Sequence, residues 1–184
     1  FQNAKQNSSI KDSGLTVTAY KNDTDISAQA LSIISAGEDN VISFYQNFGA
    51  EKANYSIKFE FPKTIDMTKA PLYAVIYVPT HLAWDNKEDK YPGFSISIDG
   101  KSLTGKINTY DMKRIGAGWK LIEINCMSNS YVVGNRAGDL QDNIKTLKSI
   151  EFTVHSNKQT SNLDAPILID WIGSNAAEKD SVEK

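Results

Sequence analysis

The sequence predicts an all-β protein, a two-sheet antiparallel β-sandwich of the jelly-roll type. Short strand-like runs follow one another along the chain, and Gly, Pro, Asn and Asp separate them. Several of these runs alternate apolar and polar residues, as a strand with one buried face must. Only residues 138–147 favour a helix, of one or two turns at most. Strands this short and this frequent are typical of two antiparallel sheets packed face to face.

The first half of the chain provides five of these runs. In the first run Tyr20 shares a face with the threonines two and four positions before it, which predicts that its ring points outward. Tyr45 in the third run shares a face with Ser43 and Asn47, which again predicts an outward ring. In the fourth run the odd positions are aromatic or aliphatic and the even positions are polar. The five predicted strands are residues 15–20, 29–35, 41–47, 55–61 and 72–78.

The second half of the chain repeats the pattern. Phe94, Ile96 and Ile98 oppose two serines and Asp99, and the run that Trp119 opens places Ile122, Ile124 and Cys126 on a single face. The predicted strands here are residues 94–99, 102–108, 119–126, 149–155 and 166–172. By alternation the predicted core aromatics are Tyr55, Phe59, Phe61, Phe94 and Phe152, with Tyr73, Tyr77 and Trp171 in the core or half-buried.

Composition and charge narrow the class of protein. With 184 residues, 40% hydrophobic and 23% charged, the chain fits one ordered domain spanning residues 1–184, in which 176–184 form a polar linker tail. The net charge is -2 and the Lys and Arg residues are scattered, which argues against nucleic acid as a partner. No apolar run approaches the length of a membrane span. The chain begins at Phe1 without an initiator Met, so we expect an excised fragment or a mature product. We also expect the protein to be a monomer.

Motifs for catalysis and metal binding are weak. Residues 100–106 spell GKSLTGK, but Ile107 stands where a phosphate-binding loop needs Ser or Thr for magnesium. There is no GxSxG elbow, and Cys126 lies on a predicted core face. Two histidines and one cysteine exclude a conventional zinc cluster. Calcium stays open, because it binds carboxylate and backbone oxygens of loops.

The loop at residues 84–91 places Trp84 and Tyr91 among six strongly polar residues. Sugar rings stack on such aromatic faces while amides and carboxylates, such as Asn86, bind the hydroxyls. The alternative is that Trp84 pins the loop to the edge of the sandwich. Further stacking candidates are Tyr20, Tyr45 and Trp119, and Glu123 and Asn125 share the predicted face of Trp119.

The order of the hydrophobic stretches resembles a known family. Residues 29–34, 72–79, 94–99, 119–125, 147–154 and 165–172 together are similar to jelly-roll carbohydrate-binding modules, most of all the mannan-binding family 27 modules of bacterial β-mannanases. The resemblance implies a non-catalytic module that holds β-1,4-mannan on a concave, tryptophan-lined face. This chain departs from that pattern, since it has only three tryptophans and Tyr20 or Tyr45 would have to replace one.

The resemblance also implies a structural calcium away from the groove, with Asp170 as a ligand. The alternation of residues 166–172 places Asp170 on a face with Leu168 and Ile172, where a carboxylate needs either a cation or a buried network of hydrogen bonds. Both alternatives remain open from the sequence.

The function that the sequence favours is binding of β-mannan or glucomannan by a secreted, extracellular module that targets a tethered glycoside hydrolase to polysaccharide. Trp84 is the expected main platform. β-Glucan and xylan are alternative ligands. From other classes, a jelly-roll lyase or hydrolase using Glu123 and a second acid, or a structural or adhesion spacer, would share this fold.

Overall fold

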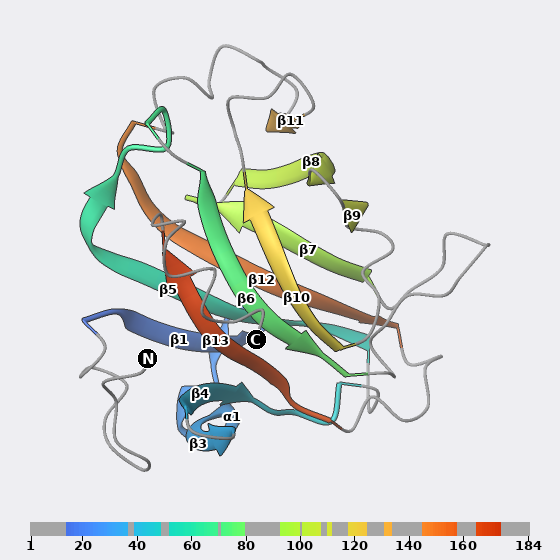
Figure 1. Cartoon of the computed structure of the whole chain (residues 1–184). Coiled ribbons are helices and arrows are strands. Elements are labelled where there is room, and N and C mark those ends of the chain that lie inside the picture. The colour runs from blue at the N-terminus through green and yellow to red at the C-terminus, as the bar shows by residue number, and fades with distance from the viewer. Residues whose placement is uncertain are drawn as a thin grey trace.

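A computed structural model describes residues 14–36, 39–48, 52–69, 71–79, 93–99, 101–107, 110–111, 118–124, 131–133, 145–157 and 165–173. Over these residues the protein consists of two antiparallel β-sheets packed face to face, with the smaller sheet in front of the larger one in Figure 1. The predicted fold class, an all-β sandwich, is confirmed. No helix in the described segments is long and apolar enough to cross a membrane.

The larger sheet has eight strands in the order β11-β8-β7-β12-β5-β1-β2, with β9 paired to β8. Its centre is formed by β12, which pairs with β5 on one side and β7 on the other. The strands are β1 (Thr16–Lys21), β2 (Thr24–Asp25), β5 (Lys52–Ile65), β7 (Gly93–Ile98), β8 (Lys101–Ile107), β9 (Tyr110–Asp111), β11 (Tyr131–Val133) and β12 (Leu147–Asn157).

The smaller sheet has five strands in the order β10-β6-β13-β4-β3. The chain passes from one sheet to the other repeatedly, so strands distant in sequence become neighbours, as β4 and β13 do. The strands are β3 (Leu31–Ala36), β4 (Asp39–Phe44), β6 (Leu72–Val78), β10 (Gly118–Ile124) and β13 (Ile167–Gly173).

The hydrophobic core fills the space between the two sheets. Phe48 lies between Phe44 and Tyr55 and contacts both rings edge-on, with ring centroids 5.3 Å apart in each pair. Phe59 and Phe152 form a third edge-on pair, at 6.1 Å. Such pairs add about 0.5–1.5 kcal/mol beyond the area that they bury. The predicted core positions of Tyr55, Phe59 and Phe152 are therefore confirmed.

One predicted core aromatic, Phe61, is less buried than expected. Phe61 packs against the core but is only partly buried. It lies one residue beyond the point where β1 stops pairing with β5, since Thr16 is opposite Glu60. Fewer neighbours therefore cover its ring. The side chain of Phe94 lies outside the described residues.

Two segments differ from the predicted secondary structure. The strand predicted to start at residue 29 is preceded by a short helix, α1 (Ser27–Ala30), and β3 begins at Leu31. The helix predicted at residues 138–147 cannot include Leu147, which is fully buried as the first residue of β12 and pairs with Ile65. Residues 138–144 lie outside the described part of the chain.

Candidate functional site

The outer face of the larger sheet is polar across its central strands. On β5 and β12 the residues that face the core are apolar, and the intervening residues point away from it. Register places Lys58 of β5 between Thr18 of β1 and Glu151 of β12. In the same way Glu60 lies between Thr16 and Ser149. Side chains from three separate stretches of sequence thus form continuous polar rows across the sheet.

The floor of an open hollow of about 710 Å³ is formed by the members of these rows on β5 and β12. This volume falls in the range of about 300–1,000 Å³ that is usual for small-ligand sites. Tyr20 contributes the aromatic ring of the lining. The other lining residues on strands are Lys58, Glu60, Lys148, Ser149 and Glu151.

Two side-chain contacts fix part of the floor. Lys58 Nζ donates a hydrogen bond of 2.8 Å to Glu60 Oε1, and the two side chains are 30% and 47% exposed. This bond, together with the negative charge of Glu60, raises the pKa of Lys58, so its ammonium group stays protonated at neutral pH. On the neighbouring row Ser56 Oγ donates a hydrogen bond to Glu151 Oε1 and so joins β5 to β12.

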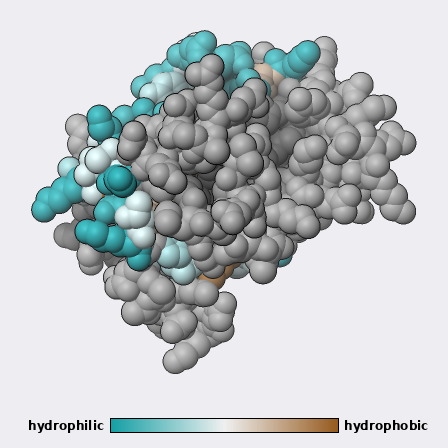
Figure 2. Space-filling view, turned by 90° about the horizontal axis from the view of Figure 1, so that it is seen from above, coloured by the Kyte–Doolittle hydropathy of each residue, from teal (hydrophilic) through white to brown (hydrophobic). Residues whose placement is uncertain are grey.

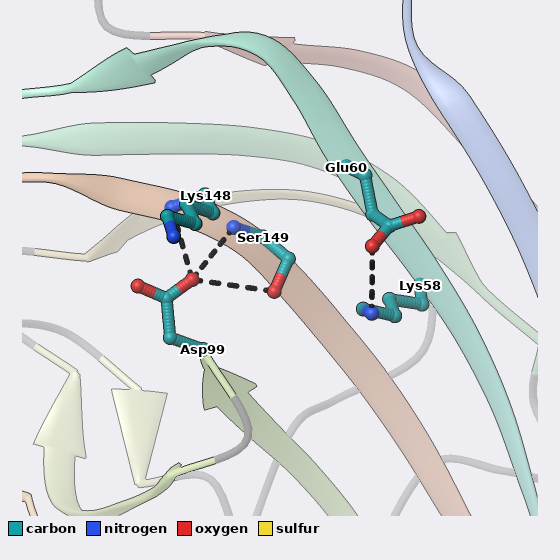
Figure 3. Close-up of polar contacts among 5 residues, drawn as sticks. All are labelled: Lys58, Glu60, Asp99, Lys148 and Ser149. Carbon is teal, nitrogen blue, oxygen red and sulfur yellow. Dashed lines mark hydrogen bonds and ion pairs between the residues drawn. The ribbon is translucent and has the colours of Figure 1, made fainter.

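Asp99 also lines the hollow, and Figure 3 shows its contacts with Lys148 and Ser149. It follows β7 with a φ of 45°, the left-handed conformation that Asp and Gly tolerate in tight turns, and Gly100 comes next in the sequence. Its Oδ1 accepts three hydrogen bonds: from the backbone N–H of Lys148 at 2.9 Å, from that of Ser149 at 2.8 Å and from Ser149 Oγ at 3.3 Å. Asp99 also donates its own N–H to the carbonyl of Ser149 at 3.1 Å.

The contacts of Asp99 coincide with an irregularity where β12 pairs with β5. Leu147 is opposite Ile65 and Ser149 is opposite Glu60, so β12 has one residue between these pairs, Lys148, and β5 has four. The additional residues therefore belong to β5, and Lys148 has no partner in the ladder with β5. The carboxylate of Asp99 accepts the N–H of Lys148, and Lys148 and Ser149, although consecutive, both line the hollow.

The opposite rim follows β1. Asn22 has a φ of 52° in the turn to β2, and it bonds to Asn54 twice, through its N–H at 2.7 Å and its side-chain Oδ1 at 3.1 Å. Asn22 and Asp23 line the hollow next to Tyr20. Both rims are therefore held by side chain-to-backbone hydrogen bonds.

The charges around the hollow are mixed but unequal. Four carboxylates and two lysines line it, so negative groups exceed positive ones by two. An anionic ligand would meet net repulsion in the hollow, whereas a neutral ligand would meet donors and acceptors without such a penalty. The carboxylates are Asp23, Glu60, Asp99 and Glu151, and the lysines are Lys58 and Lys148.

The structure separates two of the predicted stacking residues. Tyr20 points outward from the larger sheet, as predicted, and lines the hollow. Trp119 lies on β10 opposite Tyr77, on the face away from the core residue Ile122. Trp119 is 45% exposed, and its ring contacts Tyr77 edge-on with centroids 5.6 Å apart. The two rings therefore lie on opposite outer faces of the sandwich and do not line one groove.

The remaining predicted sugar-binding residues are placed only in part. Tyr45 directly follows β4 and is 45% exposed, in agreement with its predicted outward direction. Glu123 lies four residues after Trp119 on β10 and is opposite Tyr73 in the register, and its side chain is outside the described residues. Trp84, Asn86 and Asn125 also lie outside them.

Asp170, the predicted calcium ligand, is buried in β13 with 7% of its surface exposed. Its predicted face is wrong. The register with β6 shifts between Ile169 and Trp171, so Leu168 is opposite Tyr77 while Ile172 is opposite Ala74, on the other side of the sheet. One extra residue in a strand reverses the alternation that follows it.

Calcium binding itself stays a prediction. Within the described segments no three His, Cys, Asp or Glu residues gather closely enough to hold a metal ion.

Sequence reasoning did not single out most of the hollow. The alternation in β5 correctly predicts that the side chains of Lys58 and Glu60 point away from the core. The Asp99-Gly100 pair is a recognised turn signal. What alternation cannot supply is the order of the strands, which brings β1, β5 and β12 together.

Comparisons with known proteins find similar folds at low identity. No protein-family model and no curated protein matches the chain. The structure of PfGH50B overlaps 88% of this chain at 14% identity with a TM-score of 0.47, and this chain spans 24% of that one. A family 11 carbohydrate-binding module of the cellulase Lic26A-Cel5E of Clostridium thermocellum overlaps 86% of this chain and 81% of its own, at 16% identity and a TM-score of 0.41. The mannan-recognising carbohydrate-binding module TmCBM27 overlaps 88% of both chains, at 9% identity and a TM-score of 0.40. We therefore infer function from the residues of the site itself.

Proposed function

We propose that this protein is a non-catalytic carbohydrate-binding module that binds a neutral polysaccharide, β-1,4-mannan or glucomannan, in the hollow on the larger sheet. One observation carries the proposal: an open hollow in which the ring of Tyr20 adjoins acceptor and donor side chains held on a sheet. An aromatic ring stacks on the C–H face of a sugar, while carboxylates, amides and ammonium groups bind its hydroxyls.

The charges of the hollow support a neutral glycan. Two more carboxylates than lysines line the hollow, and a uronate-rich polymer would be repelled. The described residues visible from above in Figure 2 are mainly hydrophilic, with small hydrophobic areas.

Binding without chemistry is favoured by how the charged groups are engaged. The raised pKa of Lys58 keeps it protonated, which makes it a poor general base. Glu60 is paired with that lysine, and Glu151 accepts the hydroxyl of Ser56. A glycosidase needs one carboxyl group that delivers a proton to the leaving oxygen, and neither contact favours that role. In the proposed function the module is a secreted monomer that holds a tethered glycoside hydrolase at its substrate.

Affinity electrophoresis tests this function directly. We expect retardation in gels that contain galactomannan or glucomannan, and little in gels with hydroxyethylcellulose, xylan or alginate. The same protein incubated with each polymer should release no reducing ends over hours. Free migration in every gel would contradict carbohydrate binding, and sustained release of reducing ends, abolished in Glu60→Gln or Glu123→Gln, would show an enzyme instead.

A further inference from the structure

The carboxylate of Asp99 has two oxygens in different situations. Oδ1 accepts three hydrogen bonds, all from Lys148 and Ser149 at the start of β12. Oδ2 points away from these donors in Figure 3, and Asp99 lines the hollow. The residue thus uses one oxygen to hold the sheet and presents the other in a region where a ligand would lie.

The position of this second oxygen is fixed before any ligand binds. Rotation of the carboxyl group would break the three bonds to Oδ1, two of which are 2.9 Å or shorter. The backbone is held as well, by the bond from Asp99 N–H to the carbonyl of Ser149. A side chain that is already ordered loses little entropy when it binds, so its hydrogen bond contributes more to affinity than that of a mobile one.

We propose that Oδ2 of Asp99 accepts a hydrogen bond from one sugar hydroxyl of the bound glycan and that Asp99 is a specificity-determining residue of the hollow. The inference rests on the proposed function and names the atom that reads the sugar. A carboxylate only accepts hydrogen bonds, so the ligand must present a hydroxyl that donates at this point. A sugar without that hydroxyl leaves the oxygen desolvated and unpaired, a situation that discriminates strongly between ligands.

The Asp99→Asn variant of the full-length chain tests the role of Oδ2. The amide has the same shape, and its carbonyl oxygen can replace Oδ1 as the acceptor for Lys148 and Ser149. The NH₂ group then stands in the place of Oδ2 and changes a charged acceptor into a neutral donor. Because charged hydrogen bonds exceed neutral ones by about a factor of two in energy, we expect affinity for β-1,4-mannohexaose to fall about tenfold. The bonds that Oδ1 accepts are kept but weakened, so the melting midpoint should fall while the protein still folds.

Asp66→Asn provides a matched control. Asp66 also uses Oδ1 to accept a backbone N–H and a hydroxyl, both from Thr68, but it lies in the turn after β5. Its substitution should leave affinity unchanged. A loss of affinity that is equal in Asp66→Asn and Asp99→Asn would mean that the effect is one of general charge, and it would overturn the role of Asp99.

Monodeoxygenated manno-oligosaccharides tested with the unsubstituted protein provide a second measurement that does not depend on any variant. We expect one deoxygenated position to weaken binding at least tenfold, and the same sugar to lose nothing further on Asp99→Asn. If every deoxygenated sugar binds like the parent, or if Asp99→Asn binds mannohexaose like the unsubstituted protein, the inference is wrong while the proposed function stands. If the unsubstituted protein binds no polysaccharide, the proposed function itself fails.

Discussion

Replacement of Tyr20 by alanine tests which face of the sandwich binds sugar. Tyr20 projects from β1 opposite Ser56 of β5, beside the charged Lys58, and it is the aromatic residue among those that line the hollow. One aromatic ring that stacks on a flat ligand contributes about 1–3 kcal/mol, as measured for nucleic-acid bases. Loss of the ring should therefore weaken binding by about fivefold to a hundredfold.

The same substitution should affect folding far less. Tyr20 is only half-buried and contacts its neighbours on the outer face, so we expect a loss of about 1 kcal/mol or less in the free energy of unfolding. A fully buried aromatic such as Phe59 would cost about 3–5 kcal/mol when truncated to alanine. The two effects on Tyr20→Ala are thus separable in one preparation.

Calorimetric titration with β-1,4-mannohexaose, together with thermal melting, measures both quantities. Tyr45→Ala is the matched tyrosine control, and Trp119→Ala tests the opposite outer face. Trp84→Ala belongs in the same series, because the sequence predicts Trp84 as the main platform. Unchanged affinity in Tyr20→Ala would refute the assignment of the hollow, and a loss confined to Trp119→Ala would move the binding surface to the smaller sheet.

Two further expectations concern stability. If Asp170 binds calcium, EDTA should lower the melting midpoint and leave sugar affinity nearly unchanged. The reason is that a ligand that binds only the folded state stabilises that state by mass action. A midpoint that neither EDTA nor Asp170→Asn changes would exclude the ion. Hydrogen bonds from the hydroxyl and the N–H of Ser27 lower the pKa of Asp25 below 3.8. The unfolded chain then binds more protons at acid pH, so this stabilisation is present above about pH 4 and is lost as the pH falls through the folded pKa. Acid melting curves of Asp25→Asn should show a shallower loss than those of the unsubstituted protein, and identical curves would contradict this origin of acid sensitivity.

The fold was predictable because strand formation leaves a local record. β6 occupies residues 72–78 as predicted, since its apolar run is bounded by a proline on each side. The start of β3 was misplaced because residues 29–30 complete a helical turn that begins at Ser27. There Ser27 Oγ accepts the N–H of Ala19 at 2.9 Å, a contact between residues eight apart that alternation does not reveal.

The site was less predictable because it depends on register and strand order. The outward direction of Tyr20 follows from its own strand, but its neighbours in the hollow come from β5 and β12, far along the chain. Two register shifts add to the difficulty. In the first, β5 has four residues opposite Lys148 of β12, and in the second an extra residue in β13 reverses the face expected around Asp170. Neither shift has a signal in its own sequence that period-two reasoning would detect.

The aromatic residues of the smaller sheet show why counting rings overstates the number of sugar platforms. Tyr73 is buried and stacks with Trp171, with centroids 6.5 Å apart and an angle of 27°. The indole of Trp171 also lies over Gly173, where an added Cβ would stand 2.7 Å from the ring, so close packing onto the backbone holds it in place. Tyr77 is half-buried against Trp119. Of these four rings only Trp119 exposes a substantial surface, 45% of its total. Packing on the outer face therefore accounts for Tyr73, Tyr77 and Trp171, and among these four described rings Trp119 is the one on which a sugar could stack.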